Sequence, residues 1–531
     1  MPDPQPASSG DVISAPRSPL FVRAGAGVLF LAVAGAVLAE ARNVGVAWAE
    51  NDYLDHIAGI VDWAHEAWAL GLRAAVAQLT EPYWAANRYL NPHPPLFKYM
   101  AILTGSLLPG LGLPLSLRAS TALAFAGGVA AVFVSLAHRR GCAAAVVGAL
   151  ALATMPRLFG HAMLCTPDIP LAMFWLGAAL AYLHYEETRR IGWLVLAGAL
   201  CAAGVACKIS GLLMLVPLGV LMVIWRRRGG PSDVARGAAG LLLAAFAAVA
   251  TLVLTYPFLW PDPVGRFVQL VEEAAAWSRT NAFTAMFFGW VGPYTALPWY
   301  FGSVMVFLTT PPLTLGLALV GLAAARGRDR LWQLAVVEVL FWLLLVAVPS
   351  TPKYDNERQM LPAFTFLAIL AGIGWHAVIG LAARRPRIAA AATAGAALVL
   401  AVGLVRAQPF PLRYFTPLVG GPRGAVALGF EPTTLMEVLS PQVLADFQAH
   451  VPSGAGVSVL PSAGVGRFLQ RRGLLRADLR LTPERGPYWI LVNRHNVLRQ
   501  YPGSMVHEHG QLLASYALDG VALAELRYLT R

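Results

Sequence analysis

Four acidic residues occupy positions where a carboxylate could act as a general base. Glu50, Asp52 and Asp55 lie within AENDYLDHIAGIVDW, residues 49–63, directly after the first long apolar run. Helical spacing places Asp52 and Asp55 on one face of a helix, with Glu50 at its start. Asp168 begins a later apolar run. A carboxylate within hydrogen-bond reach of a hydroxyl can remove its proton, so this set predicts general-base chemistry.

Each acid also has a purely structural interpretation. Residues 49–63 could form a solvated helix beside a membrane, anchored by Trp48, Tyr53 and Trp63. Asp168 could be an N-cap residue, stabilised by the dipole of the helix that follows it. The capping role is compatible with a catalytic one, because an acid facing the interior of a helix bundle is usually functional.

The lysines are unusually few. Among 40 lysine and arginine residues only Lys98, Lys208 and Lys353 are lysines, and each lies near the end of an apolar run. Snorkelling at a membrane interface would explain any one of them. An ammonium group is also a compact point charge that suits phosphate. Two such lysines near the acids therefore predict a site for a phosphate-bearing ligand.

The elements that position these residues are predicted to be membrane spans. The chain of 531 residues is 57% hydrophobic and 13% charged, with a mean hydropathy of +0.60. Apolar runs recur, each of a length that suits a hydrocarbon core of roughly 30 Å. We predict a polytopic α-helical membrane protein with about eleven transmembrane helices. The predicted spans are 22–41, 119–137, 141–156, 169–185, 191–206, 209–225, 237–257, 299–322, 331–349, 359–380 and 388–405.

Alternate connections between these spans are basic, which predicts that they face the cytoplasm together with Arg17 and Arg23. The basic connections are HRR (138–140), EETRR (186–190), RRRGGPSDVAR (226–236), ARGRDR (325–330) and ARRPR (383–387). The predicted organisation is a cytoplasmic tail, a transmembrane domain with a long first outer loop, and an outer C-terminal domain. Their ranges are 1–21, 22–405 (outer loop 42–118) and 406–531.

The two outer regions are predicted to differ in structure. The tail alternates a helical pattern (LMEVLSPQVLADFQAHV) with short strand-like runs such as GVSVLP and YWILVN, which predicts a small α/β domain. A shorter outer loop, residues 260–280, contains an amphipathic pattern that predicts a helix along the membrane surface.

Other features of the composition narrow the classes of function. The net charge of +12 comes largely from the cytoplasmic anchors and a basic C-terminal region, and no nucleic-acid-binding motif is present. The four cysteines lie in or beside apolar segments without the spacing of metal ligands. The first apolar run ends in VLAEA, which is compatible with a signal-peptide cleavage site, although an uncleaved span is favoured.

The ordered motifs resemble those of a known family. They are the acidic stretch after the first span, HPPLFK (93–98), MPRLFGHAMLCTPDIPLAMFW (155–175), ACKISGL (206–212) and KYDNERQMLPAF (353–364). This set resembles the GT-C glycosyltransferases that use polyprenyl-phosphate sugars, in particular the protein O-mannosyltransferase-like and aminoarabinose-transferase-like branches. The resemblance covers roughly residues 20 to 405.

The resemblance implies roles for individual residues. It assigns an acid of the first outer loop as the base, but the family's Asp-Glu pair is replaced by Ala49-Glu50, so Glu50, Asp52 and Asp55 all remain candidates. Asp168 matches the acid of the second outer loop. The remaining site candidates are Lys98, Lys208 and Arg358 for the donor phosphate, with His93, Arg157, His161, Tyr354 and Asp355 nearby.

The resemblance also implies a reaction and its partners. A sugar would leave a polyprenyl-phosphate donor and move to a hydroxyl of a protein, lipid or glycan acceptor, with inversion at the sugar carbon. Fixed cations would stabilise the charge growing on the leaving phosphate. Neither a nucleotide nor a metal is required, although a divalent metal could be held by the acids. The expected location is a bacterial-type inner (plasma) membrane, with the active site on the extracytoplasmic side and no nucleic-acid partner.

Three other interpretations remain. A transporter or flippase for lipid-linked sugars would share the many spans and the cationic residues, but would more often carry charges at mid-span and paired repeats. An oligosaccharyltransferase-like enzyme is disfavoured by the absence of a WWD motif. A non-catalytic membrane scaffold is the third.

Overall fold

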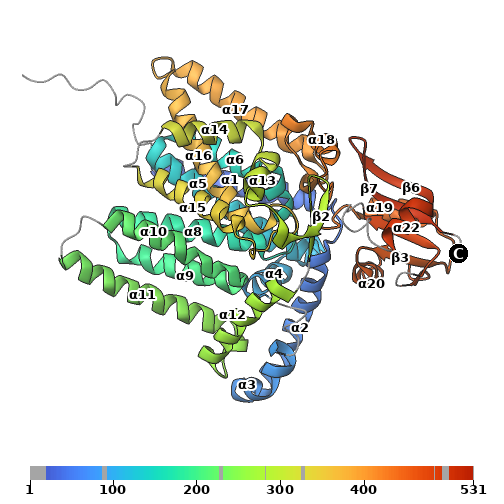
Figure 1. Ribbon diagram of the computed structural model, residues 1–531. Helices are drawn as coiled ribbons and strands as arrows, with labels where there is room; N and C mark the ends of the chain where they lie inside the picture. The colour runs from blue at the N-terminus through green and yellow to red at the C-terminus, as the bar shows by residue number, and fades with distance from the viewer. Residues whose placement is uncertain are drawn as a thin grey trace, which may run out of the picture.

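The computed structural model describes residues 19–85, 93–226, 231–280, 283–324, 329–482, 485–492 and 502–529. Arg17 and parts of the basic connections 226–236 and 325–330 lie outside these residues. Long helices run side by side as a bundle, and a sheet with its own helices lies at one end of it (Figure 1). At the lower edge of that view, α2 and α3 extend away from the bundle.

Every predicted span falls on one or more helices. The bundle helices are α1 (Pro19–Ala41), α5 (Leu115–Arg140), α6 (Cys142–Ala153), α8 (Asp168–Thr188), α9 (Ile191–Cys207), α10 (Leu215–Arg226), α11 (Pro231–Thr255), α13 (Phe301–Thr309), α14 (Pro312–Ala324), α15 (Arg330–Ala347), α16 (Leu361–Gly380) and α17 (Pro386–Ala407). The connecting elements include α2 (Trp48–Leu70), α3 (Leu72–Thr80), the π-helical turn η1 (Glu81–Ala85), α4 (Leu96–Leu107), α7 (Pro156–Ala162), the 3₁₀ turns η4 (Ile209–Met214) and η7 (Arg358–Met360), α12 (Pro263–Thr280) and a hairpin of β1 (Thr284–Phe287) and β2 (Trp290–Pro293).

In the part of the chain that the structure describes, five helices are long and apolar enough to cross a membrane, or six if the bent pair α6 and α7 counts as one span. Shorter apolar helices, such as α9 and α14, account for most of the other predicted spans. The chain is a multi-pass membrane protein, and the number of eleven spans stays a prediction.

One predicted span, 299–322, is two helices rather than one. The break lies between α13 and α14, where Thr310 adopts an extended conformation with a ψ of 132°. Pro311 follows Thr310, and the residue before a proline is disfavoured in the helical region. Since Pro311 and Pro312 also lack backbone N–H donors, the sequence TPP ends one helix and begins the next.

The basic connections lie together at one end of the bundle. Arg139, after α5, forms an ion pair with Glu187 at the end of α8. Arg140 pairs with Asp329, which caps the start of α15. Side chains from three separate connections therefore meet there, in agreement with the parity that the charge pattern predicts.

Helices α14 and α16 approach each other more closely than any side chain would allow. A Cβ atom on Gly321 would lie 2.0 Å from the carbonyl oxygen of Leu370, and one on Gly374 would lie 1.9 Å from that of Leu317. Small residues permit this contact, which gives helices van der Waals packing where water provides no hydrophobic driving force. Helix α16 also packs against α6 and α8, so it lies at the centre of the bundle.

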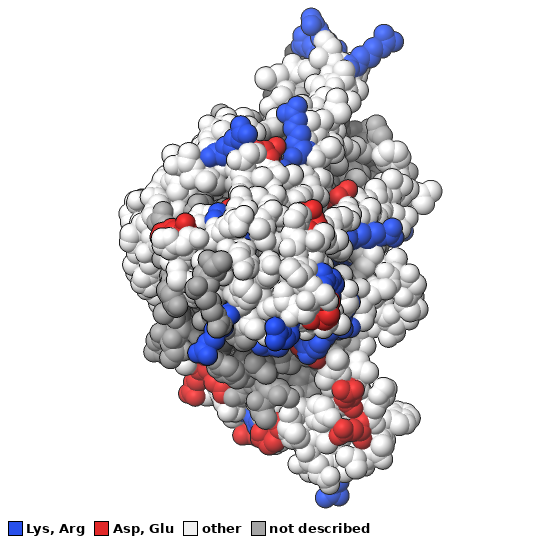
Figure 2. Space-filling view, turned by 90° about the vertical axis from the view of Figure 1, so that its right-hand side faces the viewer, with Lys and Arg blue, Asp and Glu red and all other residues white. Residues whose placement is uncertain are grey.

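The C-terminal region forms a five-stranded mixed sheet with the strand order β4-β3-β5-β7-β6. Its strands are β3 (Gly456–Leu460), β4 (Arg480–Leu481), β5 (Tyr488–Val492), β6 (Gln511–Leu518) and β7 (Val521–Tyr528), accompanied by α19 (Pro441–Ala449), α20 (Ala463–Arg471) and α22 (Gly503–His509). Strand β3 pairs in parallel with β4 and β5, while β7 pairs antiparallel with β5 and β6. On the face that carries this region, Lys and Arg stand among Asp and Glu on a largely uncharged surface (Figure 2).

The segment before α19 is not helical, although the pattern LMEVLSPQVLADFQAHV predicts a helix throughout. The helix begins only at Pro441, because Ser440 caps it by accepting a hydrogen bond from the Val443 N–H at 3.3 Å. The residues before it instead bond to the start of α2, where Trp48 N–H donates to the Leu435 carbonyl at 2.9 Å. This segment therefore fixes the position of the acid-bearing helix.

The predicted topology can be tested by cysteine labelling in intact cells. Arg480 in the sheet and Arg385 before α17 are both exposed, so cysteines there should react without disturbing the fold. We expect Arg480→Cys to react with an impermeant maleimide in intact cells and Arg385→Cys to react only after lysis. The reverse result would contradict the orientation.

Candidate active site

Three charged side chains from three separate elements meet at the end of the bundle nearest α2. Asp168 at the start of α8 accepts a hydrogen bond from Lys208 Nζ at 2.8 Å and another from Arg358 Nε at 2.9 Å. All three are buried, with exposed fractions of 3%, 8% and 4%. A lysine ammonium and an arginine guanidinium that share one carboxylate suit an anionic ligand.

The loop before α16 holds Arg358 in place. Arg358 Nη1 donates to Asp355 Oδ2 at 3.0 Å, so its guanidinium joins two carboxylates. Asp355 and Asn356 both have a φ of 58°, in the left-handed region that Asp and Asn tolerate better than most residues. The sequence KYDNER therefore supplies both the turn residues and the cation that the turn presents.

Asp168 is not an N-cap residue, contrary to its structural interpretation. Helix α8 begins at Asp168 itself, the capping position is Pro167, and no side chain caps the helix. The carboxylate instead accepts hydrogen bonds from Lys208 and Arg358. Its place in the first turn still favours its negative charge through the helix dipole.

Three N–H donors near these cations have no hydrogen-bond partner among the described residues. They are Gln359 Nε2, Asn356 Nδ2 and the indole Nε1 of Trp48. Gln359 accepts from Lys208 Nζ at 3.0 Å, and the Trp48 ring lies 5.9 Å from the Arg358 guanidinium. Buried donors nearly always have a hydrogen-bond partner. These three N–H groups therefore indicate a place for water or for a ligand with several acceptor oxygens. We refer to Asp168, Lys208, Arg358, Gln359, Asn356 and Trp48 as the anion site.

The sequence interpretation missed Gln359, Asn356 and Glu357. Glu357 pairs with Arg157 Nη1 at 3.0 Å and lies 4.0 Å from His161 Nε2. Burial raises the pKa of Glu357, while Arg157 opposes that shift. The predicted candidates Arg157 and His161 thus contact Glu357, the residue before Arg358. They help to fix the loop that carries Arg358.

Lys98 and His93 are linked directly. Lys98 lies in the first turn of α4, as the prolines before it predict, and its Nζ donates to the His93 carbonyl at 2.9 Å. Lys98 is fully buried, and its ammonium lies 5.1 Å from the centre of the Phe97 ring. Burial, and then the charge of Lys208, lower the pKa of His93 well below its usual value. His93 is therefore neutral at physiological pH.

Glu50 has a structural role that its sequence position does not predict. Its carboxylate receives Arg118 Nε at 2.8 Å, Arg118 Nη2 at 2.7 Å and the Cys165 backbone N–H at 2.8 Å. Arg118 also donates to three carbonyl groups between α1 and α2. Both oxygens of Glu50 are thus engaged in hydrogen bonds, and the residue is fully buried.

We expect Glu50→Gln to reduce stability more than it reduces the rate of the folded fraction. Breaking a buried ion pair leaves Arg118 without its counter-charge and costs about 3–5 kcal/mol. The matched control is Glu187→Gln, which removes a partly exposed ion pair with Arg139 and should cost about 0–1 kcal/mol. Thermal denaturation in detergent compares the two variants. Equal midpoints would contradict the structural role.

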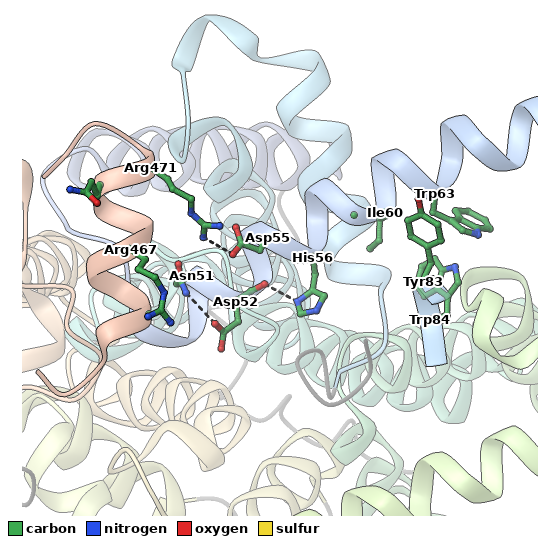
Figure 3. A pocket seen from close by; sticks show the side chains of 13 residues that line it. Asn51, Asp52, Asp55, His56, Ile60, Trp63, Tyr83, Trp84, Arg467 and Arg471 are labelled. Carbon is green, nitrogen blue, oxygen red and sulfur yellow. Dashed lines mark hydrogen bonds and ion pairs between the residues drawn. The ribbon is translucent and has the colours of Figure 1, made fainter. Parts of the chain in front are cut away.

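Asp52 and Asp55 do share a face of α2, as their spacing predicts. Both line an open-sided cavity of about 660 Å³ between α2, η1 and α20. Asp55 pairs with Arg471 at 2.8 Å, whereas Asp52 accepts from Asn51 Nδ2 at 3.1 Å (Figure 3). Partial removal from water raises the pKa of Asp52, and the charge of Asp55 adds to the shift.

Asp52 is the acid of this cavity nearest the anion site along α2. Trp48 of the anion site precedes Asp52 by one helical turn, so the two side chains lie on the same side of the helix.

Tyr354 lies on the loop that carries Arg358, with its ring 4.6 Å from that of Phe283. Burial raises the pKa of Tyr354 to about 12, so its hydroxyl stays protonated and can donate a hydrogen bond.

One buried acidic residue lies in the middle of a bundle helix, away from this site. Glu338, in the middle of α15, is fully buried and accepts a hydrogen bond from Trp175 Nε1 at 2.8 Å. The sequence interpretation, which places the polar cluster on one face only, did not consider it. Among the described residues, no group of three or more His, Cys, Asp or Glu is arranged to hold a metal ion.

Comparisons with known proteins show one family match and two structures with a similar fold. Residues 92–255 match the family model for dolichyl-phosphate-mannose-protein mannosyltransferase. The crystal structure of ArnT from Cupriavidus metallidurans in the apo state is similar, with a TM-score of 0.52 and 14% identity over 95% of this chain and 98% of that one. The same protein bound to undecaprenyl phosphate gives a TM-score of 0.52 and 13% identity over 94% and 98% of the two chains. No curated protein sequence matches the chain.

The family match and the structural similarity support each other. The matched region, residues 92–255, contains Lys98, Asp168 and Lys208, so it includes two of the charged residues of the anion site. The similarity to ArnT extends over nearly the whole of both chains and establishes the fold. The chain is therefore a multi-pass membrane protein with the fold of ArnT, and part of it matches the family model for dolichyl-phosphate-mannose-protein mannosyltransferase.

Proposed function

We propose that this protein transfers a sugar from a polyprenyl-phosphate donor to an acceptor hydroxyl on the extracytoplasmic face of the membrane. The observation that carries the proposal is the anion site, in which one carboxylate stands between two cations beside unpartnered N–H donors. The similar ArnT structure that holds undecaprenyl phosphate supports this choice of donor.

The anion site would bind the phosphate of the donor. Lys208 provides a compact charge, and Arg358 provides a planar fork with several N–H groups. The free amide N–H groups of Gln359 and Asn356 add neutral donors. As the bond between the sugar and the phosphate breaks, negative charge grows on the phosphate, and fixed donors stabilise that charge without reorganising.

Asp52 would be the base. The acceptor oxygen attacks the anomeric carbon from the side opposite the phosphate, and its proton passes to the Asp52 carboxylate. The electron pair of the broken carbon–oxygen bond leaves with the polyprenyl phosphate, so one displacement inverts the sugar carbon. The raised pKa of Asp52 makes it a better proton acceptor than an ordinary aspartate.

Asp168 would set the charge of the anion site. While the site is empty, Asp168 neutralises part of the positive charge of Lys208 and Arg358 and fixes both side chains. When a phosphate binds, the two cations are already in position and lose little conformational freedom. The loop that carries Arg358 would be kept in place by the contacts of Glu357 with Arg157 and His161.

We expect Asp52→Asn to lower transfer by about a hundredfold or more, because an amide cannot accept the proton. Transfer by the unchanged enzyme should fall as the pH drops through the Asp52 pKa, which lies above 3.8, since the protonated acid is no longer a base. Asp62→Asn is the control, because Asp62 lies on the same helix, is exposed and does not line the cavity. If Asp52→Asn kept full activity, Asp52 would not be the base.

The proposed function is tested with purified protein in nanodiscs, radiolabelled polyprenyl-phosphate sugars and membrane extracts. We expect label to move from the lipid donor to a new product, with one polyprenyl phosphate released for each sugar transferred. A transporter would instead move labelled lipid across the bilayer of a proteoliposome without forming a product. That outcome would contradict the proposal.

A further inference from the structure

The cavity beside the anion site is built from both ends of the chain. One wall is a face of α2 that includes Asp52 and Asp55, and the facing wall is α20 of the C-terminal region with Arg467 and Arg471. In Figure 3 the side chains of both helices point into the space between them. At about 660 Å³ the cavity has the size of a small-molecule site rather than a packing defect.

Polar atoms in the wall of this cavity lack partners among the described residues. They are the carbonyl Oδ1 of Asn51 and the indole Nε1 atoms of Trp63 and Trp84. Asn51 and Trp84 are each only 6% exposed, so bulk solvent does not reach most of either side chain. One buried acceptor and two buried donors therefore lie unpartnered in residues of this wall, and Asp52 also lines the cavity.

The aromatic side chains form a continuous wall next to these atoms. The rings of Trp63 and Trp84 lie 5.3 Å apart in an edge-to-face arrangement, and Trp84 also contacts Tyr99 and Tyr256. This packing holds the two indole N–H groups in fixed positions. On the facing wall, Arg467 is exposed and provides further donors, and Gln470 lies one turn further along α20.

We infer that this cavity binds a carbohydrate acceptor, and that α20 of the C-terminal region helps to select it. A sugar hydroxyl both donates and accepts, so the hydroxyls of an oligosaccharide can bond to Asn51 and Asp52 at one end of the cavity and to the indole N–H groups at the other, about 18 Å further along α2. An acyl chain would leave these polar atoms unsatisfied. A peptide offers only one hydroxyl per serine or threonine, so most of its hydrogen bonds would have to come from its backbone.

The inference rests on the proposed function and adds a position for the acceptor. Asp52 belongs to the cavity, and Trp48 of the anion site lies one turn away on the same helix. An acceptor in the cavity would therefore place a hydroxyl beside the proposed base, on the side facing the donor. This arrangement brings the two substrates together before reaction.

The test is binding of the purified full chain, in nanodiscs, to a glycan array and to an array of serine- and threonine-containing peptides. Trp84→Phe removes one N–H and keeps an aromatic ring, and Arg467→Gln changes an exposed residue that the fold does not require. We expect the unchanged protein to bind glycans. Each variant should weaken this binding by about three- to tenfold, the effect of one lost hydrogen bond.

Trp68→Phe is the matched control, because Trp68 lies on α2, is 92% exposed and does not line the cavity. It should bind glycans normally, and all three variants should bind polyprenyl phosphate normally. The inference would be overturned if the unchanged protein bound no glycan or preferred peptides to glycans. It would also be overturned if neither Trp84→Phe nor Arg467→Gln weakened glycan binding. Failure of the unchanged protein to bind polyprenyl phosphate would instead contradict the proposed function.

Discussion

Asp168→Asn should lower transfer by about two to three orders of magnitude while the protein still inserts and folds. The carboxylate has one oxygen for Lys208 and another for Arg358, whereas an amide has only one acceptor and would turn an N–H towards a cation. The two cations would then lose both their common counter-charge and their fixed geometry. Loss of a positioned charge of this kind typically costs about 10²- to 10³-fold in rate.

A control separates a catalytic effect of this variant from a general loss of stability at a helix start. Asp329→Asn is its control, because Asp329 also stands at the start of a helix and caps it, but at the opposite end of the bundle. Transfer is measured with saturating donor, and folding is measured by size exclusion and thermal denaturation. Normal transfer by Asp168→Asn would remove the anion site from the mechanism, and equal losses in the two variants would reduce it to a structural effect.

Arg358→Lys should weaken donor binding by about tenfold or more, although it keeps the positive charge. Arg358 uses Nε for Asp168 and Nη1 for Asp355, and both bonds are about 3 Å long. A lysine ammonium cannot reproduce this planar fork and is more strongly hydrated, so it is a poor substitute in a buried site. The measurement is the affinity for polyprenyl phosphate in nanodiscs.

Arg140→Lys provides the comparison for this substitution. Arg140 also pairs with an aspartate, Asp329, but it lies at the opposite end of the bundle. It should lower stability without changing the affinity for the lipid phosphate. Full affinity in Arg358→Lys would mean that charge alone, and not the guanidinium geometry, serves the phosphate.

Local structure was largely predictable from the sequence. Apolar runs of sufficient length form helices because only a helix satisfies its own backbone in a membrane. Pro94 and Pro95 delay α4 until Leu96, as their fixed backbone angles require. The pair Pro311–Pro312 was the exception, because the apolar composition of 299–322 masked a break that the two prolines impose.

The types of residue in the candidate site could also be read from the sequence, but the role of each could not. Acids and lysines at the ends of apolar runs predict charge at one face of a bundle, whatever the packing. Glu50, Asp52 and Asp55 are indistinguishable at that level, because they share one short acidic stretch. Their roles depend on which partner each one meets.

The tertiary structure alone decides those partners. Glu50 pairs with Arg118, which lies 68 residues away, directly before the predicted span 119–137. Asp168 meets Arg358 over a separation of 190 residues. Asp52 faces a cavity whose other wall comes from α20. No local pattern carries this information, because buried charges are paired by the packing of distant helices, and that packing leaves Asp52 free to face the cavity.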